Sequence, residues 1–253
     1  MSLLGLPAEL RLRIYDFLPE LQQDRIETVT PYSSHQTPSI CRVSQIFHRE
    51  TLPIYTANSL FSFPIDDAPE TWARQVESWI LALGPSAISR VRSIQFSQHW
   101  NITQPMRWMR HVGFYLRIER SKSSDISSRT GLDQSAGFND AWADHFVKPS
   151  RVSDWQVTSG TYPMARDARA RRLQSVELLA QTTEAYFRTR GAQEHSTGLS
   201  PGDVWFLMQA VNIVASHAIP YYDFNESGND RGREPCETWY NMKSELELLV
   251  AQT

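Results

Sequence analysis

The chain begins with a segment in which apolar residues recur at helical spacing. The apolar positions, which alternate with charged residues, are Leu6, Leu10, Ile14, Phe17 and Leu18. Pro7 suits the first turn of a helix, and Pro19 disfavours a helical conformation in the residue before it. The pattern therefore predicts a short amphipathic helix that ends before Pro19.

The same spacing predicts two more helices in the first part of the chain. One runs from about Pro38 to Tyr55, and Pro53 should interrupt its last turn. Its apolar stripe consists of Ile40, Val43, Ile46, Phe47, Thr51 and Ile54. The next helix carries Trp72, Val76, Trp79, Ile80 and Leu83, and Gly84-Pro85 ends it. Short strands are predicted at residues 25–29 and 60–63.

The rest of the chain combines alternating strands with long helical stretches. Strands are predicted at residues 92–97, 112–118 and 155–158. A serine-rich loop is expected at residues 119–137 and a short helix at 140–147. Helices are predicted over residues 165–190, from Pro201 onward, and after a loop at 225–235. We expect an α+β fold that is mainly α, in which C-terminal helices cover a small antiparallel sheet.

Composition narrows the class of protein without indicating a reaction. The 253 residues include 25 basic and 28 acidic side chains, a net charge of −3, which argues against general affinity for nucleic acid. The longest uncharged stretch, 204–222, contains too many polar residues for a membrane span, and the first 18 residues lack the apolar core of a secretory signal. Two cysteines, Cys41 and Cys236, fit a reducing compartment. We therefore expect a cytoplasmic or nuclear protein.

Two blocks near the N-terminus resemble F-box proteins. Residues 6–18, LPAELRLRIYDFL, are similar to the opening of the motif in the form LPxELRxxIYxxL, which is common in fungal F-box-like proteins. Residues 40–51, ICRVSQIFHRET, resemble the second block of that family, and residues 54–63 resemble its ending. The resemblance covers roughly residues 1–100, and the segment between the two helices is longer than in a compact F-box.

The resemblance implies a helical module that presents apolar side chains to a Skp-type adaptor, which joins it to a cullin ubiquitin ligase. The implied contact residues are Leu6, Pro7, Leu10, Ile14 and Leu18 in the first helix and Val43 and Ile46 in the second. The alternative is that the same side chains pack against the chain's own sheet and helices, as those of most amphipathic helices do.

Other polar groups offer weaker hypotheses. A basic cluster at the start of a predicted helix could bind an anion or could be a solvated face; its members are Arg166, Arg169, Arg171 and Arg172. His217 precedes Tyr221, Tyr222 and Asp223, which together could line a pocket. The sequence has no zinc-protease motif, phosphate-binding glycine loop or nucleophile elbow, so no metal, cofactor or catalytic residue is predicted.

We therefore expect a protein-interaction adaptor, and the resemblance gives this role a specific form: the substrate-recognition subunit of a cullin-type ubiquitin ligase. Its partners would be a Skp-type adaptor and a protein substrate that the sequence does not identify. Residues 1–62 would form the F-box-like segment and residues 63–253 an α+β domain. The alternative is a stand-alone interaction or scaffold protein whose F-box-like helices are internal core, and an enzyme is the third possibility.

Overall fold

The computed structural model is α+β, as predicted, and helices account for more of its described residues than strands do. The structure describes residues 3–23, 25–30, 37–65, 69–102, 110–120, 145–152, 154–161, 166–193, 198–217 and 237–252. It has two compact units. Unit 1 comprises residues 1–95 and 196–204, and unit 2 comprises residues 96–195 and 205–253. The predicted division at residue 62 falls inside a strand, whereas the two units divide near residue 95.

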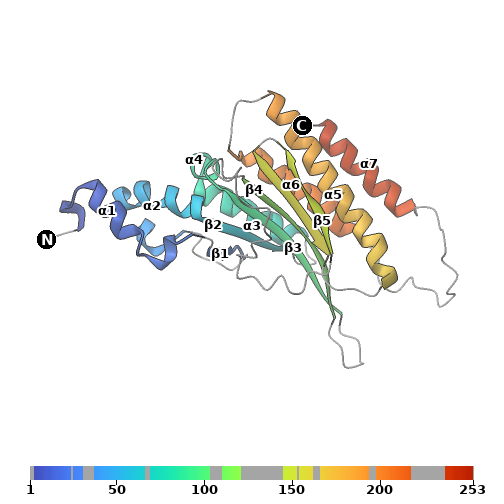
Figure 1. The fold of residues 1–253 in the computed structure, drawn as a ribbon, viewed down its shortest axis with the longest axis horizontal. Coiled ribbons are helices and arrows are strands. Elements are labelled where there is room, and N and C mark those ends of the chain that lie inside the picture. Colours follow the sequence, from blue (N-terminus) through green and yellow to red (C-terminus); the bar gives the residue numbers. More distant parts are fainter. Residues whose placement is uncertain are drawn as a thin grey trace. The chain divides into compact units, whose positions relative to one another are not determined.

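Unit 1 begins with short helices and a parallel pair of strands (Figure 1). Its elements up to the first paired strands are η1 (Leu3–Gly5), α1 (Ala8–Tyr15), η2 (Pro19–Leu21), β1 (Arg25–Thr28), η3 (Ser39–Arg42), α2 (Gln45–Asn58) and β2 (Ser59–Ile65). β1 and β2 are parallel, and Ile26 lies opposite Leu60. Since α2 connects them, this part of the chain is a β-α-β unit, a pairing that the sequence analysis did not specify.

Aromatic side chains build the core of unit 1 between β2 and α3 (Pro69–Leu83). Trp79 of α3 contacts Phe61 and Phe63 edge-on, with ring centroids 5.0 and 5.2 Å apart, and the Phe61 ring also meets Tyr55 of α2. Phe61 and Phe63 share one face of the strand because successive side chains alternate. All four rings are buried, so α2 is anchored to the sheet by its C-terminal half.

Two glycines in unit 1 occupy positions that disfavour a larger residue, one through its backbone conformation and one through lack of room. Gly84 ends α3 with a φ of 73°, a conformation that side chains disfavour, and Pro85 then begins α4 (Pro85–Ile88). Gly198 lies so close to Ser89 that an added Cβ would come within 2.2 Å of its carbonyl oxygen. The backbone at Gly198 therefore packs directly against the backbone that follows α4.

The strand order is β1-β2-β3-β4-β6-β5. The strands that follow β2 along the chain are β3 (Ser93–Ile102), β4 (Arg110–Arg120), β5 (His145–Val152) and β6 (Trp155–Thr161). β6 pairs antiparallel with both β4 and β5; an antiparallel sheet was predicted, but β5 was not predicted as a strand. The register with β5 shifts between Val147 and Ser150, where Pro149 lacks the backbone N–H that a regular ladder would use.

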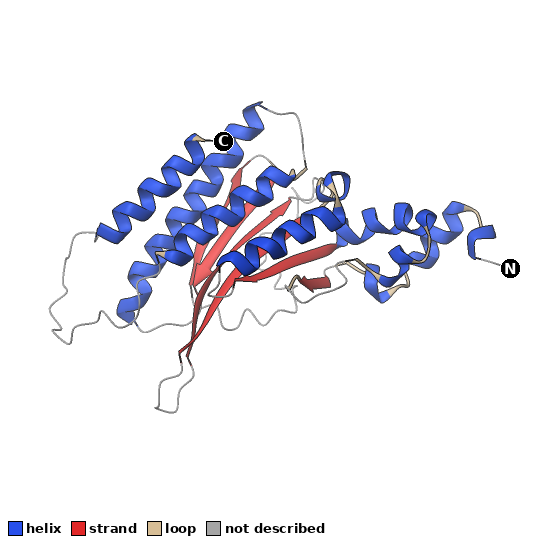
Figure 2. Ribbon diagram, turned by 180° about the vertical axis from the view of Figure 1, so that it is seen from behind, coloured by secondary structure: helices blue, strands red, loops and turns tan. Residues whose placement is uncertain are grey.

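Three long helices accompany the strands of unit 2: α5 (Arg166–Gln193), α6 (Pro201–Ser216, from Trp205 in this unit) and α7 (Glu237–Ala251). α5 packs on β4, β5 and β6 and also contacts α7 (Figure 2). Tyr186 of α5 stacks on Phe206 of α6 with ring centroids 3.7 Å apart. These helices match the three predicted from apolar spacing.

Three predictions of secondary structure are wrong in detail. The helix expected over residues 38–55 is divided into η3 and α2, because the backbone of Ser44 is extended and its hydroxyl accepts a hydrogen bond from the Phe47 N–H. α2 then continues past Pro53 to Asn58. The helix expected at 140–147 is contradicted over residues 145–147, which pair with β6, and residues 140–144 lie outside the described residues. Of the loop expected at 119–137, residues 119 and 120 belong to β4 instead, and residues 121–137 lie outside the described residues, as does the loop expected at 225–235.

Candidate interaction surface

α1 is held against α2 by polar groups on the side that faces the protein. Glu50 of α2 accepts hydrogen bonds from the Tyr15 hydroxyl at 2.7 Å and from Nε of Arg11 at 3.0 Å, and it also pairs with the Arg11 Nη2 group. Arg11 donates a further hydrogen bond to the carbonyl oxygen of Leu6. The Tyr15 ring also meets Phe47 edge-on at 6.3 Å. We call Arg11, Tyr15 and Glu50 the polar clasp.

The protonation states of the three side chains strengthen the polar clasp. Hydrogen bonds from Arg11 and Tyr15 lower the pKa of Glu50 to about 2, so its carboxylate is charged at neutral pH. Burial, followed by the hydrogen bond to Glu50, raises the pKa of Tyr15 to about 12, so its phenol is protonated. The hydrogen bond with Glu50 likewise raises the pKa of Arg11. The clasp therefore combines two opposite charges with one neutral donor.

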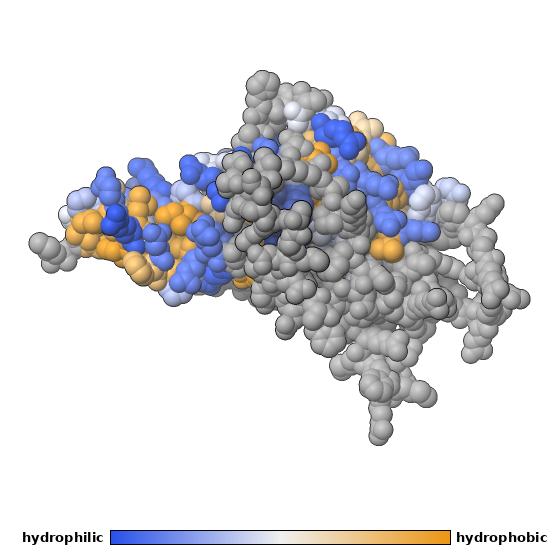
Figure 3. Space-filling view, in the orientation of Figure 1, coloured by the Kyte–Doolittle hydropathy of each residue, from blue (hydrophilic) through white to orange (hydrophobic). Residues whose placement is uncertain are grey.

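The apolar side chains of α1 and of the start of α2 lie at the surface instead. Leu10 is 47% exposed, Ile14 is 37% exposed and Val43 is 66% exposed. Ile46 and Pro7 are also exposed, whereas Leu6 and Leu18 are half-buried. Leu10 and Ile14 are one helical turn apart and thus share one side of α1. The structure therefore brings the sequence-predicted contact residues to a surface region of unit 1 that carries much exposed apolar area (Figure 3).

The exposed apolar surface includes three residues that the sequence analysis did not name as contacts: Leu4, Leu12 and Phe17. Phe17 is 81% exposed. Its position on the apolar stripe suggested burial in a helix, but α1 ends at Tyr15, so the helical spacing no longer applies at residue 17. Hydrophobicity was the available signal for these residues, but it did not distinguish exposed from buried positions. We call the seven exposed side chains Leu4, Leu10, Leu12, Ile14, Phe17, Val43 and Ile46 the N-terminal apolar surface.

The described parts of the segment between α1 and α2 are tied to the structure on both sides. Glu20 of η2 accepts hydrogen bonds from the backbone N–H and the hydroxyl of Ser39 in η3. The Asn58 side chain at the end of α2 donates to the carbonyl oxygen of Leu21 at 2.8 Å. Together with the pairing of β1 on β2, these contacts link the segment to the sheet of unit 1.

The other sequence candidates are less well supported. Arg166, Arg169, Arg171 and Arg172 lie in the first turns of α5, but their side chains are outside the described part. Cys41 is buried, burial raises the pKa of its thiol, and its sulfur lies 3.1 Å from the Thr51 hydroxyl. Within the described residues, no group of three or more acidic, histidine or cysteine side chains could hold a metal ion.

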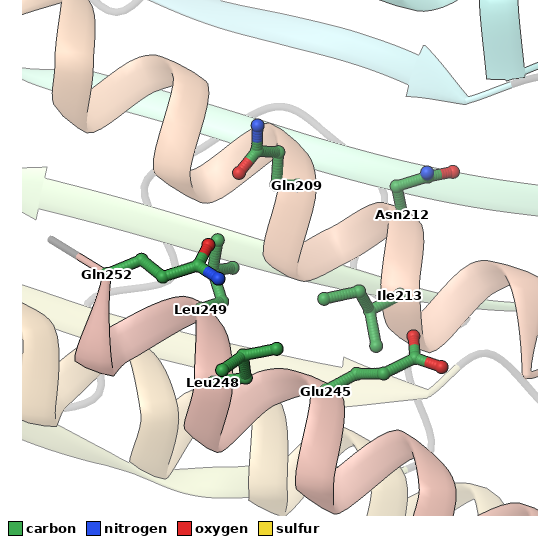
Figure 4. Close-up of a pocket in the computed structure, with 7 residues that line it drawn as sticks. All are labelled: Gln209, Asn212, Ile213, Glu245, Leu248, Leu249 and Gln252. Atoms are coloured by element: carbon green, nitrogen blue, oxygen red, sulfur yellow. The ribbon is translucent and has the colours of Figure 1, made fainter.

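His217 lies at the end of α6, and its Nε2 is 2.9 Å from the Glu245 carboxylate of α7. Glu245 also borders a small, open groove of about 280 Å³ between α6 and α7 (Figure 4). The groove is lined by Gln209, Asn212, Ile213, Glu245, Leu248, Leu249 and Gln252. Tyr221, Tyr222 and Asp223 lie outside the described residues. His217 is thus brought beside a carboxylate, but it does not line this groove.

No helix within the described ranges has both the length and the apolar character needed to cross a membrane. Comparisons of the chain with profiles of protein families, with curated proteins and with solved structures find no match.

Proposed function

We propose that the protein is a protein-interaction adaptor that binds its partner through the N-terminal apolar surface. The observation that carries this proposal is that apolar side chains of α1 are exposed, while a charged one and a tyrosine face the protein. Its charged Arg11 and its Tyr15 face the protein in the polar clasp, while Leu10 and Ile14 are exposed. Helices of globular proteins usually bury the apolar stripe and expose the charges. A clustered apolar surface is typical of a binding site for another protein.

The specific form of the proposal is that the partner is a Skp-type adaptor and that the protein is a substrate-recognition subunit of a cullin-type ubiquitin ligase. This form depends on the resemblance of residues 6–18 and 40–51 to F-box motifs. Five of the seven contact residues implied by that resemblance are exposed, and Leu6 and Leu18 are half-buried. The exposed positions argue against the alternative in which the helices are internal core.

The surface is large enough to contribute useful binding energy. Leu10, Ile14, Val43 and Ile46 retain between 37% and 66% of their exposure, so burying the remainder is worth roughly 1 kcal/mol for each. Part of that gain is lost to the ordering of side chains on association. Replacing two of these residues with aspartate should therefore weaken binding by at least about 30-fold.

The test is co-purification with a purified Skp-type adaptor. We expect the unmodified chain to bind and the double variant Leu10→Asp, Ile14→Asp to lose binding while its circular dichroism spectrum and melting temperature stay unchanged. Leu81→Asp is the matched control, since Leu81 is an exposed leucine on α3 of the same unit. Failure of the unmodified chain to bind would overturn the ligase role, and binding by the double variant would overturn the assignment of the surface.

A further inference from the structure

Little of α1 is buried in the protein. Within this helix, every residue of which the structure describes, Tyr15 is the one that is buried, and its ring meets Phe47. Leu10, Leu12 and Ile14 are all exposed, so burial of an apolar stripe does not fix how α1 lies. Apolar contacts have no preferred direction, whereas hydrogen bonds do. The position of α1 therefore depends on its directional contacts.

The polar clasp supplies these directional contacts. Nε of Arg11 and the Tyr15 hydroxyl bind one oxygen of the Glu50 carboxylate, and Nη2 of Arg11 binds the other. Two parallel hydrogen bonds between a guanidinium and a carboxylate hold both planar groups in one orientation. Arg11 also donates to the carbonyl oxygen of Leu6, which precedes α1. One arginine thus joins the start of α1 to α2.

The polar clasp lies between two halves of the N-terminal apolar surface. Leu10 and Ile14 in α1 each come directly before a residue of the clasp. Ile46 in α2 lies one turn before Glu50. The contacts of Glu50 therefore set the spacing between the half that α1 carries and the half that α2 carries. A partner that covers both halves meets them in this arrangement only while α1 is docked on α2.

We propose that Glu50 is a positioning residue for partner binding, because it holds α1 where both halves of the N-terminal apolar surface can contact one partner. The role rests on the proposed function, since the surface that Glu50 positions is the proposed binding surface. Glu50 acts through Arg11 and Tyr15, which bind its carboxylate. When a binding-competent state is only partly populated, the apparent Kd rises by the inverse of its fraction. Docking α1 in advance avoids that loss of affinity.

Binding kinetics with a purified Skp-type adaptor test this role by surface plasmon resonance. Glu50→Gln should raise the Kd about tenfold, and the change should lie in the association rate, because binding must wait for α1 to dock. Leu10→Ala removes a contact and should instead raise the dissociation rate. Glu77→Gln, which removes an exposed carboxylate from α3, is the matched control and should change neither rate. An unchanged Kd in Glu50→Gln, or a change confined to its dissociation rate, would overturn the proposal.

A destabilised control separates positioning from general stability. Gly198→Ala should weaken unit 1, because the added Cβ would lie 2.2 Å from the Ser89 carbonyl oxygen, and neither residue belongs to the polar clasp. It should therefore leave the Kd for the adaptor unchanged. A loss of affinity in Gly198→Ala equal to that in Glu50→Gln would show that stability alone matters, and it would refute the positioning role.

Hydrogen exchange tests the position of α1 without a partner. Glu50→Gln should speed exchange at the backbone amides of residues 11–15 at least about fivefold, whereas Gly198→Ala should leave these amides unchanged. Unchanged exchange in Glu50→Gln would overturn the proposal, even if the affinity fell. Failure of the unmodified chain to bind the adaptor would overturn the ligase role and with it the role of Glu50 in that complex. The exchange result would still decide whether the polar clasp holds α1.

Discussion

Replacing Glu50 with glutamine tests whether the polar clasp orients α1. Glutamine keeps the shape of the side chain and one acceptor oxygen, but it removes the charge that Arg11 and Tyr15 bind. Hydrogen bonds to a charged group contribute about 1.5–3 kcal/mol, against about 1 kcal/mol for neutral pairs. The Glu50 side chain is 21% exposed, which screens part of this difference. We therefore expect Glu50→Gln to lower the free energy of unfolding by about 1–2 kcal/mol at pH 7.

The lowered pKa of Glu50 determines how the loss of stability in Glu50→Gln should change with pH. The pKa of Glu50 is lowered from 4.5 to about 2 in the folded protein, so its stabilising effect is fully present above pH 4.5. It is lost as the pH falls from 4.5 toward 2, where the protonated carboxyl resembles the glutamine amide. The difference between the two proteins should therefore disappear over this interval.

The assay is urea unfolding followed by far-ultraviolet circular dichroism at pH 7, 5, 4, 3 and 2. Glu77→Gln is the control for removal of a carboxylate, because Glu77 is exposed on α3. A double-mutant cycle with Tyr15→Phe measures the coupling between the phenol and the carboxylate. A difference that is absent at pH 7, or that stays constant down to pH 2, would show that the charge of Glu50 does not hold α1.

Three further predictions concern the framework of unit 1. Gly198→Ala should lower the free energy of unfolding by about 1–3 kcal/mol, because the added Cβ would lie 2.2 Å from the Ser89 carbonyl oxygen. Gly5→Ala is the control and should not destabilise the protein, because a Cβ at residue 5 would meet nothing within 4 Å. Ser44→Ala should cost about 1 kcal/mol in the same urea assay, because α2 loses its N-terminal cap. The isolated fragment 1–62 should give a disordered circular dichroism spectrum, because it cuts β2 and lacks α3; a cooperative unfolding transition would contradict this.

Sequence patterns predicted the elements in which buried residues recur with the regular spacing of a helix or a strand. α3 was predicted because Trp72, Val76, Trp79 and Leu83 recur on one face, and all of them are buried. β4 was predicted because Phe114, Leu116 and Ile118 alternate, although Tyr115 on the other face is also buried. In both elements the buried face is set by residues close together in the sequence.

The features that sequence patterns missed depend on contacts between distant residues. The parallel pairing of β1 with β2 joins segments that α2 separates, and short strands give no local sign of their direction. The strand β5 depends on pairing with β6, where Phe146 lies opposite Gly160. Ser44 had a local signal, since serine is a preferred N-cap, but the apolar residues on either side of it suggested one continuous helix.

The N-terminal apolar surface shows why apolar spacing alone does not reveal which side chains are exposed. Leu10 in α1 and Val76 in α3 both belong to helical apolar stripes, yet Leu10 is exposed and Val76 is fully buried. The two helices differ in which side chains they turn toward the protein. α1 directs the charged Arg11 toward Glu50, whereas α3 directs Trp79 toward β2. Whether an apolar stripe is exposed therefore depends on where the neighbouring charged residues find their partners. The partner of Arg11 lies 39 residues away, so the sequence near α1 does not show it.

α1 has only eight residues, and a helix of that length is not stable alone in water. The polar clasp and the contact between Tyr15 and Phe47 hold it, so its apolar side chains are not needed to attach it to the protein. The orientation of α1 and the affinity for a partner should then respond differently to substitutions. Glu50→Gln should lower both stability and partner affinity, although it leaves every apolar side chain in place. Leu10→Asp with Ile14→Asp should lower partner affinity alone, because those two side chains contribute little to the core. If both variants lost stability to the same extent, Leu10 and Ile14 would be part of the structural framework, and the N-terminal apolar surface would lose its role in binding.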